Sequence, residues 1–284
     1  MYLIIGVTGQ LGQELYARYP GAIGLRHSHI AVEDPLIIEA ITEMQPKVIF
    51  NCSAYHVPSD CEIYPEKAYQ INCLGPRNLA IAAKKVGAKL VHFSTDYVFD
   101  GNLGTEYAES DVPNPINTYG ITKLAGEHFI RSHCDNYIIA RVSALFGRYK
   151  CKAKKFNFPQ MMINNAKNGV LNVVDDQFIT PTYTYNLVQQ IDLMLKEDLR
   201  GVYHTTNETT VSWFEFTKMI MKTIGMVVDI VPTKTTEGNV NRPINSSLDN
   251  GVLKVLRLNA MWDLQKSLGH YLNGLHETIC DVTG

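Results

Sequence analysis

A glycine-rich turn at the start of the chain restricts the fold more than any other feature. Tyr2–Ile5 is a short apolar run typical of a buried strand, and Gly6-Val7-Thr8-Gly9-Gln10-Leu11-Gly12 follows it directly, before an expected helix over residues 13–19. Glycines at such a turn let the backbone approach a pyrophosphate, whose charge the N–H groups and the positive end of the helix can hold. At the first strand-to-helix turn of a chain, this pattern predicts a dinucleotide-binding sheet.

The alternation of strand and helix continues along the first half of the chain. Expected strands near residues 23–25 and at 47–51, 89–93 and 137–141 are separated by helical stretches, among them residues 68–86. This rhythm predicts an α/β fold of the Rossmann type, a doubly wound parallel sheet. Ligands of such sheets bind beyond the carboxyl ends of the strands.

After Arg141 the rhythm becomes irregular, and no second cofactor motif occurs. We expect residues 1–148 to form an NADP-binding Rossmann domain with a return segment near 176–200. Residues 149–175 and 201–284 would form a smaller, mixed α/β nucleotide-sugar-binding lobe. The basic run at residues 150–155 is either a solvated loop or a mobile segment whose lysines attract a diphosphate.

Composition favours a small-molecule ligand over a macromolecular partner. The 284 residues carry a formal net charge of −2, which gives no electrostatic argument for binding nucleic acid or an anionic membrane. No uncharged apolar run is long enough to span a bilayer, and the first residues do not form a signal peptide, so we expect a cytoplasmic protein. The six cysteines include no CxxC pair, which fits reduced thiols and predicts no zinc site.

The residues after the second strand bear on the cofactor. NAD-specific sites place an acidic residue there for the ribose 2′-hydroxyl, whereas this chain has Arg26-His27-Ser28. A cation beside a hydroxyl suits the extra phosphate of NADPH, although NADH stays open, and the alternative is a solvated loop arginine. After the third strand, small residues ending at Ala54 would let a cofactor lie close to the backbone.

The stretch from Val91 to Lys123 carries the candidate catalytic groups. Thr95 leaves the end of a strand, and Tyr119 opens an expected helix on which Lys123 lies four residues later, on the same face. A tyrosine with a pKa of about 10 is a poor acid–base catalyst at neutral pH, and a neighbouring cation would lower that pKa. The three groups could meet one carbonyl oxygen, although a tyrosine and a lysine also fall at this spacing by chance.

Several linked motifs occur in order: GVTGQLGQEL, NCSAY, INCLGPRNLA, STDYVFDG, NPINTYGITKLAGE, VVDDQ with TPTY, and RPINSSLDN. In them the chain resembles the extended short-chain dehydrogenase/reductases and, within these, the dTDP-4-dehydrorhamnose reductase family. The resemblance implies an NADPH-dependent oxidoreductase with Thr95, Tyr119 and Lys123 as catalytic residues. The implied reaction reduces the C4 ketone of dTDP-4-dehydro-L-rhamnose to dTDP-L-rhamnose, for surface polysaccharide synthesis.

The resemblance also implies binding residues. The cofactor contacts would be Gly6, Gly9, Gln10, Leu11, Gly12, Arg26, Ala54, Asn72, Tyr119 and Lys123. The nucleotide-sugar contacts would be Asp96, Val98, Asn157, Gln177 and Arg242. Some family members link a dimer through magnesium held by glutamates. Glu14 matches one of these but TPTYTYN supplies no second, so we predict no metal and leave a homodimer open.

Departures from the family pattern keep other functions open. Where members carry a tryptophan in RTSWV near the sugar, this chain has Ala144, which predicts a more open pocket and allows a different sugar. A bifunctional 3,5-epimerase/4-reductase would need a further acid–base pair, for which His56, Ser59 and Cys61 are available. A non-catalytic NADP-binding regulatory subunit is the third reading, although it would not need an activated phenol.

Overall fold

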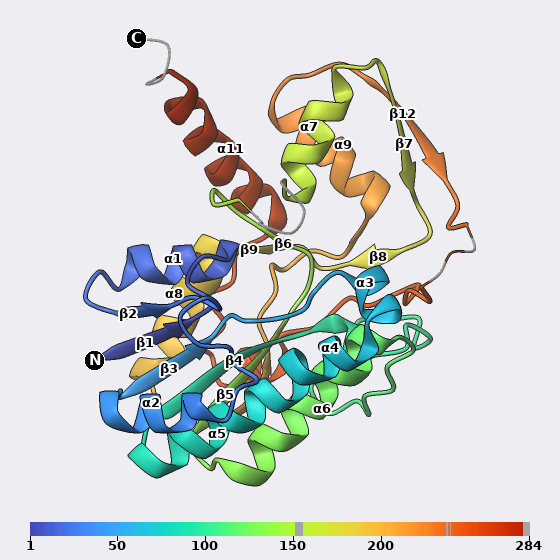
Figure 1. Cartoon of the computed structure of the whole chain (residues 1–284). Helices are drawn as coiled ribbons and strands as arrows, with labels where there is room; N and C mark the ends of the chain where they lie inside the picture. The colour runs from blue at the N-terminus through green and yellow to red at the C-terminus, as the bar shows by residue number, and fades with distance from the viewer. Residues whose placement is uncertain (151–155, 237, 239, 281–284) are drawn as a thin grey trace.

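Six parallel strands form the main sheet, in the order β10-β5-β4-β3-β1-β2 (Figure 1). The computed structural model describes residues 1–150, 156–236, 238 and 240–280. The strands of the main sheet are β1 (Tyr2–Ile5), β2 (Ile23–Leu25), β3 (Val48–Asn51), β4 (Lys89–Thr95), β5 (Tyr137–Val142) and β10 (Gly201–His204). The strand order reverses between β1 and β3, which is where such sheets bind ligands.

Helices cover both faces of this sheet (Figure 1). One face carries α1 (Gln10–Arg18) and α8 (Thr184–Lys196), and the other carries α2 (Leu36–Met44), α5 (Gly75–Val86) and α6 (Thr118–His133). Successive strand residues point to opposite faces, so Val91 packs in the cluster with α1 and α8 while Leu90 packs in the cluster with the other three helices. The strands are therefore apolar on both sides, and the predicted doubly wound Rossmann-type fold is confirmed.

The expected helix over residues 68–86 consists of three pieces. After α3 (Pro58–Ile63), the chain forms α4 (Pro65–Tyr69), a π-helical turn η1 (Gln70–Leu74) and then α5. Single π turns are rare and often lie at functional sites. This one presses against α6, because a Cβ atom on Gly126 would lie 2.3 Å from the carbonyl oxygen of Asn72.

A second group of elements packs around the aromatic side chains of Phe146, Phe216 and Tyr271. Its members are β6 (Leu145–Phe146), α7 (Phe158–Ala166), β7 (Val170–Val174), β8 (Phe178–Ile179), β9 (Thr182–Tyr183), β11 (Val211–Ser212), α9 (Trp213–Thr223), β12 (Asp229–Thr233) and α11 (Leu264–Cys280). The strands pair only in twos. No helix among the described residues has the length and apolar character needed to cross a bilayer.

The predicted lobe boundary at residue 201 is wrong for β10. This strand, placed with the sugar-binding lobe, instead pairs with β5 at the edge of the main sheet, with Tyr203 opposite Ala140. Tyr203 then joins the apolar cluster beneath α8, and the short helix α10 (Gly251–Val255) adds Leu253 to the same cluster. A four-residue strand does not encode which sheet edge it joins. The lysines at 152, 154 and 155 lie outside the described residues.

Candidate active site

The glycine turn after β1 forms a close cradle. Gly6 has φ +79°, and a Cβ atom there would lie 2.9 Å from the backbone nitrogen of Ser53. A Cβ atom on Gly12 would lie 2.3 Å from the carbonyl oxygen of Gly6, so α1 packs directly on the turn. Gly9 caps α1 with no side-chain hydrogen bond, and the first turn of the helix holds no acidic residue. The cradle therefore fits an anionic diphosphate.

Three other predicted cofactor residues lie around this turn in different ways. The Gln10 side chain is buried, and its Nε2 has no hydrogen-bond partner within the described part of the chain. Leu11 packs into the core, so only its backbone could meet a ligand. Arg26 directly follows β2 and is exposed, and its guanidinium makes no bond to any other described residue. It is thus available to an external phosphate.

The buried Asn72 side chain forms hydrogen bonds with the loop after β3. Its Oδ1 accepts from the Tyr55 backbone N–H (2.8 Å), and its Nδ2 donates to the Tyr55 carbonyl (2.9 Å) and to Thr122 Oγ1 on α6 (3.1 Å). The side chain is 1% exposed. Asn72 therefore fixes the backbone next to the half-buried Ala54, and its side chain is fully engaged within the protein.

Two of the three predicted catalytic residues, Thr95 and Tyr119, come close together where β4 ends and α6 begins. Thr95 is the last residue of β4 and Tyr119 the second residue of α6, and the Thr95 hydroxyl acts to lower the pKa of the phenol. The start of α6 is held firmly because Asn117 Oδ1 accepts from Gly120 N–H (2.9 Å) and the Glu62 carboxylate accepts from Thr118 N–H (2.8 Å). These caps fix the direction in which the phenol points.

The prediction that Lys123 lowers the pKa of Tyr119 is not what the structure shows. Burial raises the pKa of Tyr119 above its usual value, and the neighbouring Thr95 hydroxyl opposes this. The charge of Asp96 adds to the rise. The spacing of four residues does put Lys123 on the same helix, but its amine turns away, toward β4. Tyr119 is therefore a protonated phenol at neutral pH.

Lys123 is buried against two strands. Its Nζ donates to the Phe93 carbonyl (2.6 Å) and lies 3.2 Å from His92 Nε2, while His92 Nδ1 lies 2.9 Å from Asn51 Nδ2. Burial lowers the pKa of Lys123 to about 8, against the opposing charge of Glu127. The sequence interpretation missed His92 and Asn51, because polar residues inside apolar strands give no periodic signal.

Asp96 and Val98, two predicted sugar contacts, face the protein interior. The Asp96 carboxylate accepts from Thr95 Oγ1 (3.0 Å), Ser143 Oγ (2.8 Å) and Ser246 Oγ (2.6 Å). Burial raises the pKa of Asp96, and the three hydroxyls, Ser246 most, oppose this. The Val98 side chain is fully buried in a small apolar cluster, in the 3₁₀ turn η2 (Asp96–Val98). Neither side chain is free to meet a ligand.

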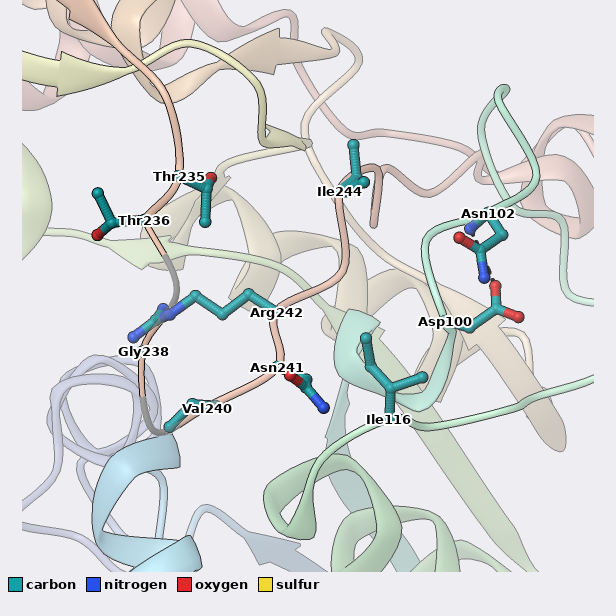
Figure 2. Close-up of a pocket in the computed structure, with 10 residues that line it drawn as sticks. All are labelled: Asp100, Asn102, Ile116, Thr235, Thr236, Gly238, Val240, Asn241, Arg242 and Ile244. Carbon is teal, nitrogen blue, oxygen red and sulfur yellow. Dashed lines mark hydrogen bonds between the residues drawn. The ribbon is translucent and has the colours of Figure 1, made fainter.

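A cavity of about 530 Å³ has Arg242 on its wall, whereas Thr95, Tyr119 and Lys123 are not among its lining residues (Figure 2). Figure 2 shows the Arg242 side chain extending toward the backbone near Gly238. Its Nη1 donates to the Tyr97 hydroxyl oxygen (3.2 Å), and the Tyr97 ring packs edge-on against Tyr119 with centroids 5.8 Å apart. Tyr97 therefore connects one wall residue of the cavity to the phenol, and the cavity has the size of a small-ligand site.

Gln177 and Asn157 differ in their relation to this cavity: Gln177 bonds a residue of its wall, and Asn157 bonds other parts of the protein. Gln177 Nε2 donates to Thr235 Oγ1 (3.0 Å), and Thr235 lines the cavity, so Gln177 supports its wall. Asn157 caps α7 by accepting from Gln160 N–H (3.1 Å), and its Nδ2 donates to the Gly147 carbonyl (2.7 Å). Its hydrogen-bonding groups are thus used inside the protein.

A family model described as the RmlD substrate binding domain matches residues 1–277. The chain belongs to this family. Within the RmlD family, a Streptomyces niveus protein named dTDP-4-keto-6-deoxy-D-glucose reductase is 33% identical over 252 residues, covering 85% of this chain and 86% of its own.

Two solved structures share the fold over nearly the whole length. A dTDP-4-dehydrorhamnose reductase from Clostridium acetobutylicum is 34% identical with a TM-score of 0.92, and covers 97% of this chain and 99% of its own. The Bacillus anthracis enzyme of the same name, solved in complex with NADP, is 33% identical with a TM-score of 0.91, and covers 96% of this chain and 98% of its own.

Glu14 is the residue that the sequence resemblance matched to a metal-binding glutamate. Its buried carboxylate accepts from Arg148 Nη2 (2.8 Å) and Thr184 Oγ1 (3.3 Å). Burial raises the pKa of Glu14, and the Arg148 cation opposes this. Among the described side chains, no group of three or more acidic, histidine or cysteine residues is placed to hold a metal. That the protein needs no metal stays a prediction.

Proposed function

We propose that this protein is an NADPH-dependent reductase of the 4-keto group in a dTDP-linked 4-keto-6-deoxyhexose. The first candidate substrate is dTDP-4-dehydro-L-rhamnose, with dTDP-L-rhamnose as product. The observation that carries the proposal is the close approach of Thr95, the last residue of β4, and Tyr119, near the start of α6, at the carboxyl edge of the sheet. The names of the RmlD-family relatives and the NADP complex of one of them support this choice.

NADPH, when bound, supplies the hydride that reduces the ketone. The glycine turn and the start of α1 would hold its diphosphate, because their N–H groups carry no side-chain cap. Arg26 would pair with the 2′-phosphate. The buried amine of Lys123, at the end of β4, would hold the nicotinamide ribose.

Tyr119 would give its phenolic proton to the oxygen that gains charge as the ketone is reduced. Its raised pKa suits this role, since the acid must still hold its proton at neutral pH. The Thr95 hydroxyl lies beside the phenol and would hydrogen-bond the same substrate oxygen. Arg242, which orients Tyr97, would face the charged diphosphate of the sugar nucleotide across the cavity.

The test follows NADPH absorbance with purified protein and dTDP-4-dehydro-L-rhamnose, with Tyr119→Phe beside it. We expect rapid oxidation by the wild type and a loss of about a hundredfold or more in the variant. NADPH binding without oxidation of this sugar or of UDP- and GDP-linked 4-keto sugars would instead support the regulatory-subunit reading.

A second substrate has specific support. The Streptomyces niveus relative is named for dTDP-4-keto-6-deoxy-D-glucose, and this chain has Ala144, in a left-handed backbone conformation with φ +41°, where the sequence predicts a more open pocket. The comparison of kcat/KM for the two sugars, measured with one enzyme preparation, decides which is the better substrate.

Cys61 is not a suitable base for the epimerase reaction considered as an alternative. This thiol is fully buried and donates to the Tyr55 carbonyl (3.3 Å), and burial raises its pKa to about 12. A thiol that holds its proton at neutral pH does not abstract one from carbon. Solvent deuterium appearing in the product at C3 or C5 would contradict this. A homodimer, a cytoplasmic location and the absence of nucleic-acid binding stay predictions.

A further inference from the structure

Asn117, the residue before α6, has a buried side chain whose two polar atoms bond two different parts of the site. Its Oδ1 accepts from the Gly120 N–H (2.9 Å), which caps α6, and its Nδ2 donates to the Asn241 carbonyl (2.9 Å). Only 4% of the residue is exposed. One side chain therefore joins the helix that carries the phenol to the segment that carries Arg242.

The two backbone partners determine which way the Asn117 amide points. A backbone N–H can only donate and a backbone carbonyl can only accept, so the amide oxygen must face Gly120 and the NH₂ group must face Asn241. Serine and aspartate cap helices about as well as asparagine does. The carboxylate of an aspartate, however, has no hydrogen to donate to Asn241, and a serine side chain is one atom shorter. The cap and the second bond can therefore be separated by substitution.

Tyr97 provides a second connection between the same two segments. Arg242 Nη1 donates to the Tyr97 hydroxyl oxygen (3.2 Å), and the Tyr97 ring packs edge-on against Tyr119. The backbone of Tyr97 also lies close to α6, because a Cβ atom on Gly120 would be 2.1 Å from the Tyr97 carbonyl oxygen. The start of α6, the turn η2 and residues 241–242 therefore contact one another in a closed set. Within this set the position of the guanidinium depends on that of the phenol.

The chain around Arg242 is held on both sides of that residue. On the C-terminal side, the Ile244 carbonyl accepts from the Phe178 N–H (2.8 Å). On the N-terminal side, the bond from Asn117 holds the carbonyl of Asn241. Asn241 and Arg242 are themselves exposed, and Figure 2 shows them next to each other on the wall of the cavity. Loss of the Asn117 bond should therefore release the backbone of Arg242 on one side.

We propose that Asn117 is a positioning residue for the sugar nucleotide: its amide holds Asn241 against the start of α6 and so keeps Arg242 in place on the cavity wall. The inference rests on the proposed function for the identity of the ligand, whose diphosphate Arg242 would meet. The anionic part of the substrate would then be bound at a fixed place relative to the Tyr119 hydroxyl. Because the contact acts by preorganising Arg242, its benefit to binding cannot exceed the free energy of one hydrogen bond.

The first measurement uses NMR and needs no ligand. The dipeptides Asn241-Arg242 and Tyr119-Gly120 each occur once in the sequence, so paired ¹³C and ¹⁵N labels assign the amides of Arg242 and Gly120. The heteronuclear NOE of each amide reports its motion on the picosecond to nanosecond timescale. We expect the NOE of Arg242 to fall in Asn117→Ser and in Asn117→Asp, while that of Gly120 stays at the wild-type value because the cap is kept.

Asn117→Ala removes the cap as well, so the NOE of both amides should fall in that variant. An Arg242 NOE that is unchanged in Asn117→Ser and Asn117→Asp would overturn the proposal. An equal fall at Gly120 in these two variants would also overturn it, because the side chain would then act only through the start of α6. The isosteric Asn117→Asp keeps the test valid if the smaller serine side chain destabilises the fold.

The second measurement is a calorimetric titration with dTDP, arranged as a double-mutant cycle. Asn117→Ser should raise the Kd of dTDP about fivefold, the value of one neutral hydrogen bond, and Arg242→Gln about tenfold or more. If Asn117 acts through Arg242, adding Asn117→Ser to Arg242→Gln should raise the Kd less than about twofold further. Asn165→Ser, at an exposed position in α7, is the matched control and should leave the Kd unchanged.

Full additivity of the Asn117 and Arg242 substitutions would overturn the proposal, because Asn117 would then affect binding by a separate route. A wild type that does not bind dTDP would overturn the assigned ligand and the inference with it. Neither measurement uses NADPH or a sugar substrate. Failure here is therefore distinct from failure to oxidise NADPH, which would instead contradict the proposed reductase function.

Discussion

The hydroxyl of Thr95 donates its hydrogen bond to Asp96 Oδ1 at 3.0 Å. The other carboxylate oxygen accepts from Ser143 at 2.8 Å and from Ser246 at 2.6 Å. Ser246 lies in the segment that follows the cavity wall, so this carboxylate joins the end of β4 to the opposite side of the site. The Thr95 oxygen in turn accepts from the Tyr97 N–H (3.2 Å), so Asp96 and Tyr97 together fix the Thr95 hydroxyl beside Tyr119.

Asp96 should therefore affect the chemical step more than sugar binding. In Asp96→Asn the NH₂ group replaces one acceptor, and at least one of the three hydroxyls must turn. We expect kcat to fall by about a hundredfold, as for other small misplacements of catalytic groups, with KM for the sugar changed little. Steady-state kinetics on both substrates check this. Ser246→Ala, which removes one donor only, should lose less; a large rise in KM with normal kcat would instead make Asp96 a sugar contact.

Arg242 should act mainly on binding. Its guanidinium is exposed on the cavity wall and bonds only the Tyr97 hydroxyl among the described residues, so it is available to a diphosphate. We expect Arg242→Gln to raise KM for the sugar nucleotide about tenfold to a hundredfold, the value of a hydrogen bond to a charged group. The exposed Arg257, in the turn that follows α10, provides the control Arg257→Gln. Equal kinetics in both variants would remove Arg242 from the site.

Arg26 should set the preference between the two nicotinamide cofactors. It follows β2 with no partner among the described residues, in the position where a 2′-phosphate would lie. Arg26→Gln should lower kcat/KM for NADPH about tenfold to a hundredfold and leave NADH nearly unchanged. The ratio of the two kcat/KM values is the measurement. An equal loss with both cofactors would show that Arg26 holds the loop rather than the phosphate.

The sequence predicted those parts of the site that follow from local spacing. The glycine turn between β1 and α1, and the shared helix of Tyr119 and Lys123, both depend on residues close together in the chain. The direction of the Lys123 amine depends instead on the Phe93 carbonyl and on His92, which belong to a strand about 30 residues away. Spacing along one helix cannot show which of several neighbours a long side chain will choose.

The residues that were assigned by resemblance have different surroundings in the structure. Arg242 lines a cavity, and its contact with the nucleotide sugar stays a prediction, whereas the Asp96 and Asn157 side chains are occupied by hydrogen bonds within the protein. Motif matching gives position in the chain but not the partner of each polar atom. The sheet position of β10 was missed for a related reason, since four residues carry no information about the free edge of β5.

Lys123 should make stability depend on pH in a defined window. Its folded pKa of about 8 lies below the unfolded value of about 10.4, so between these pH values the unfolded chain binds more protons. The free energy of unfolding of the wild type should therefore rise relative to that of Lys123→Met by about 2 kcal/mol from pH 7.5 to pH 10. Urea unfolding of both proteins at each pH measures the difference between their unfolding free energies. Taking this difference cancels the contributions of the other titrating groups. A constant difference would show that Lys123 keeps an ordinary pKa.

Gly12 should be required by packing and not by conformational freedom. Its φ is not in the left-handed region, but a Cβ atom there would lie 2.3 Å from the Gly6 carbonyl oxygen and 2.9 Å from the Val7 Cα atom. These are backbone atoms, so α1 itself must shift away from the turn that would hold the diphosphate. We expect Gly12→Ala to cost about 2 kcal/mol or more of unfolding free energy and to weaken NADPH binding. Gly21→Ala is the matched control, because a Cβ atom at Gly21 meets nothing within 4 Å. Denaturant unfolding and NADPH fluorescence titration measure the two effects. If Gly12→Ala lost stability but bound NADPH normally, the diphosphate would have to lie away from the start of α1.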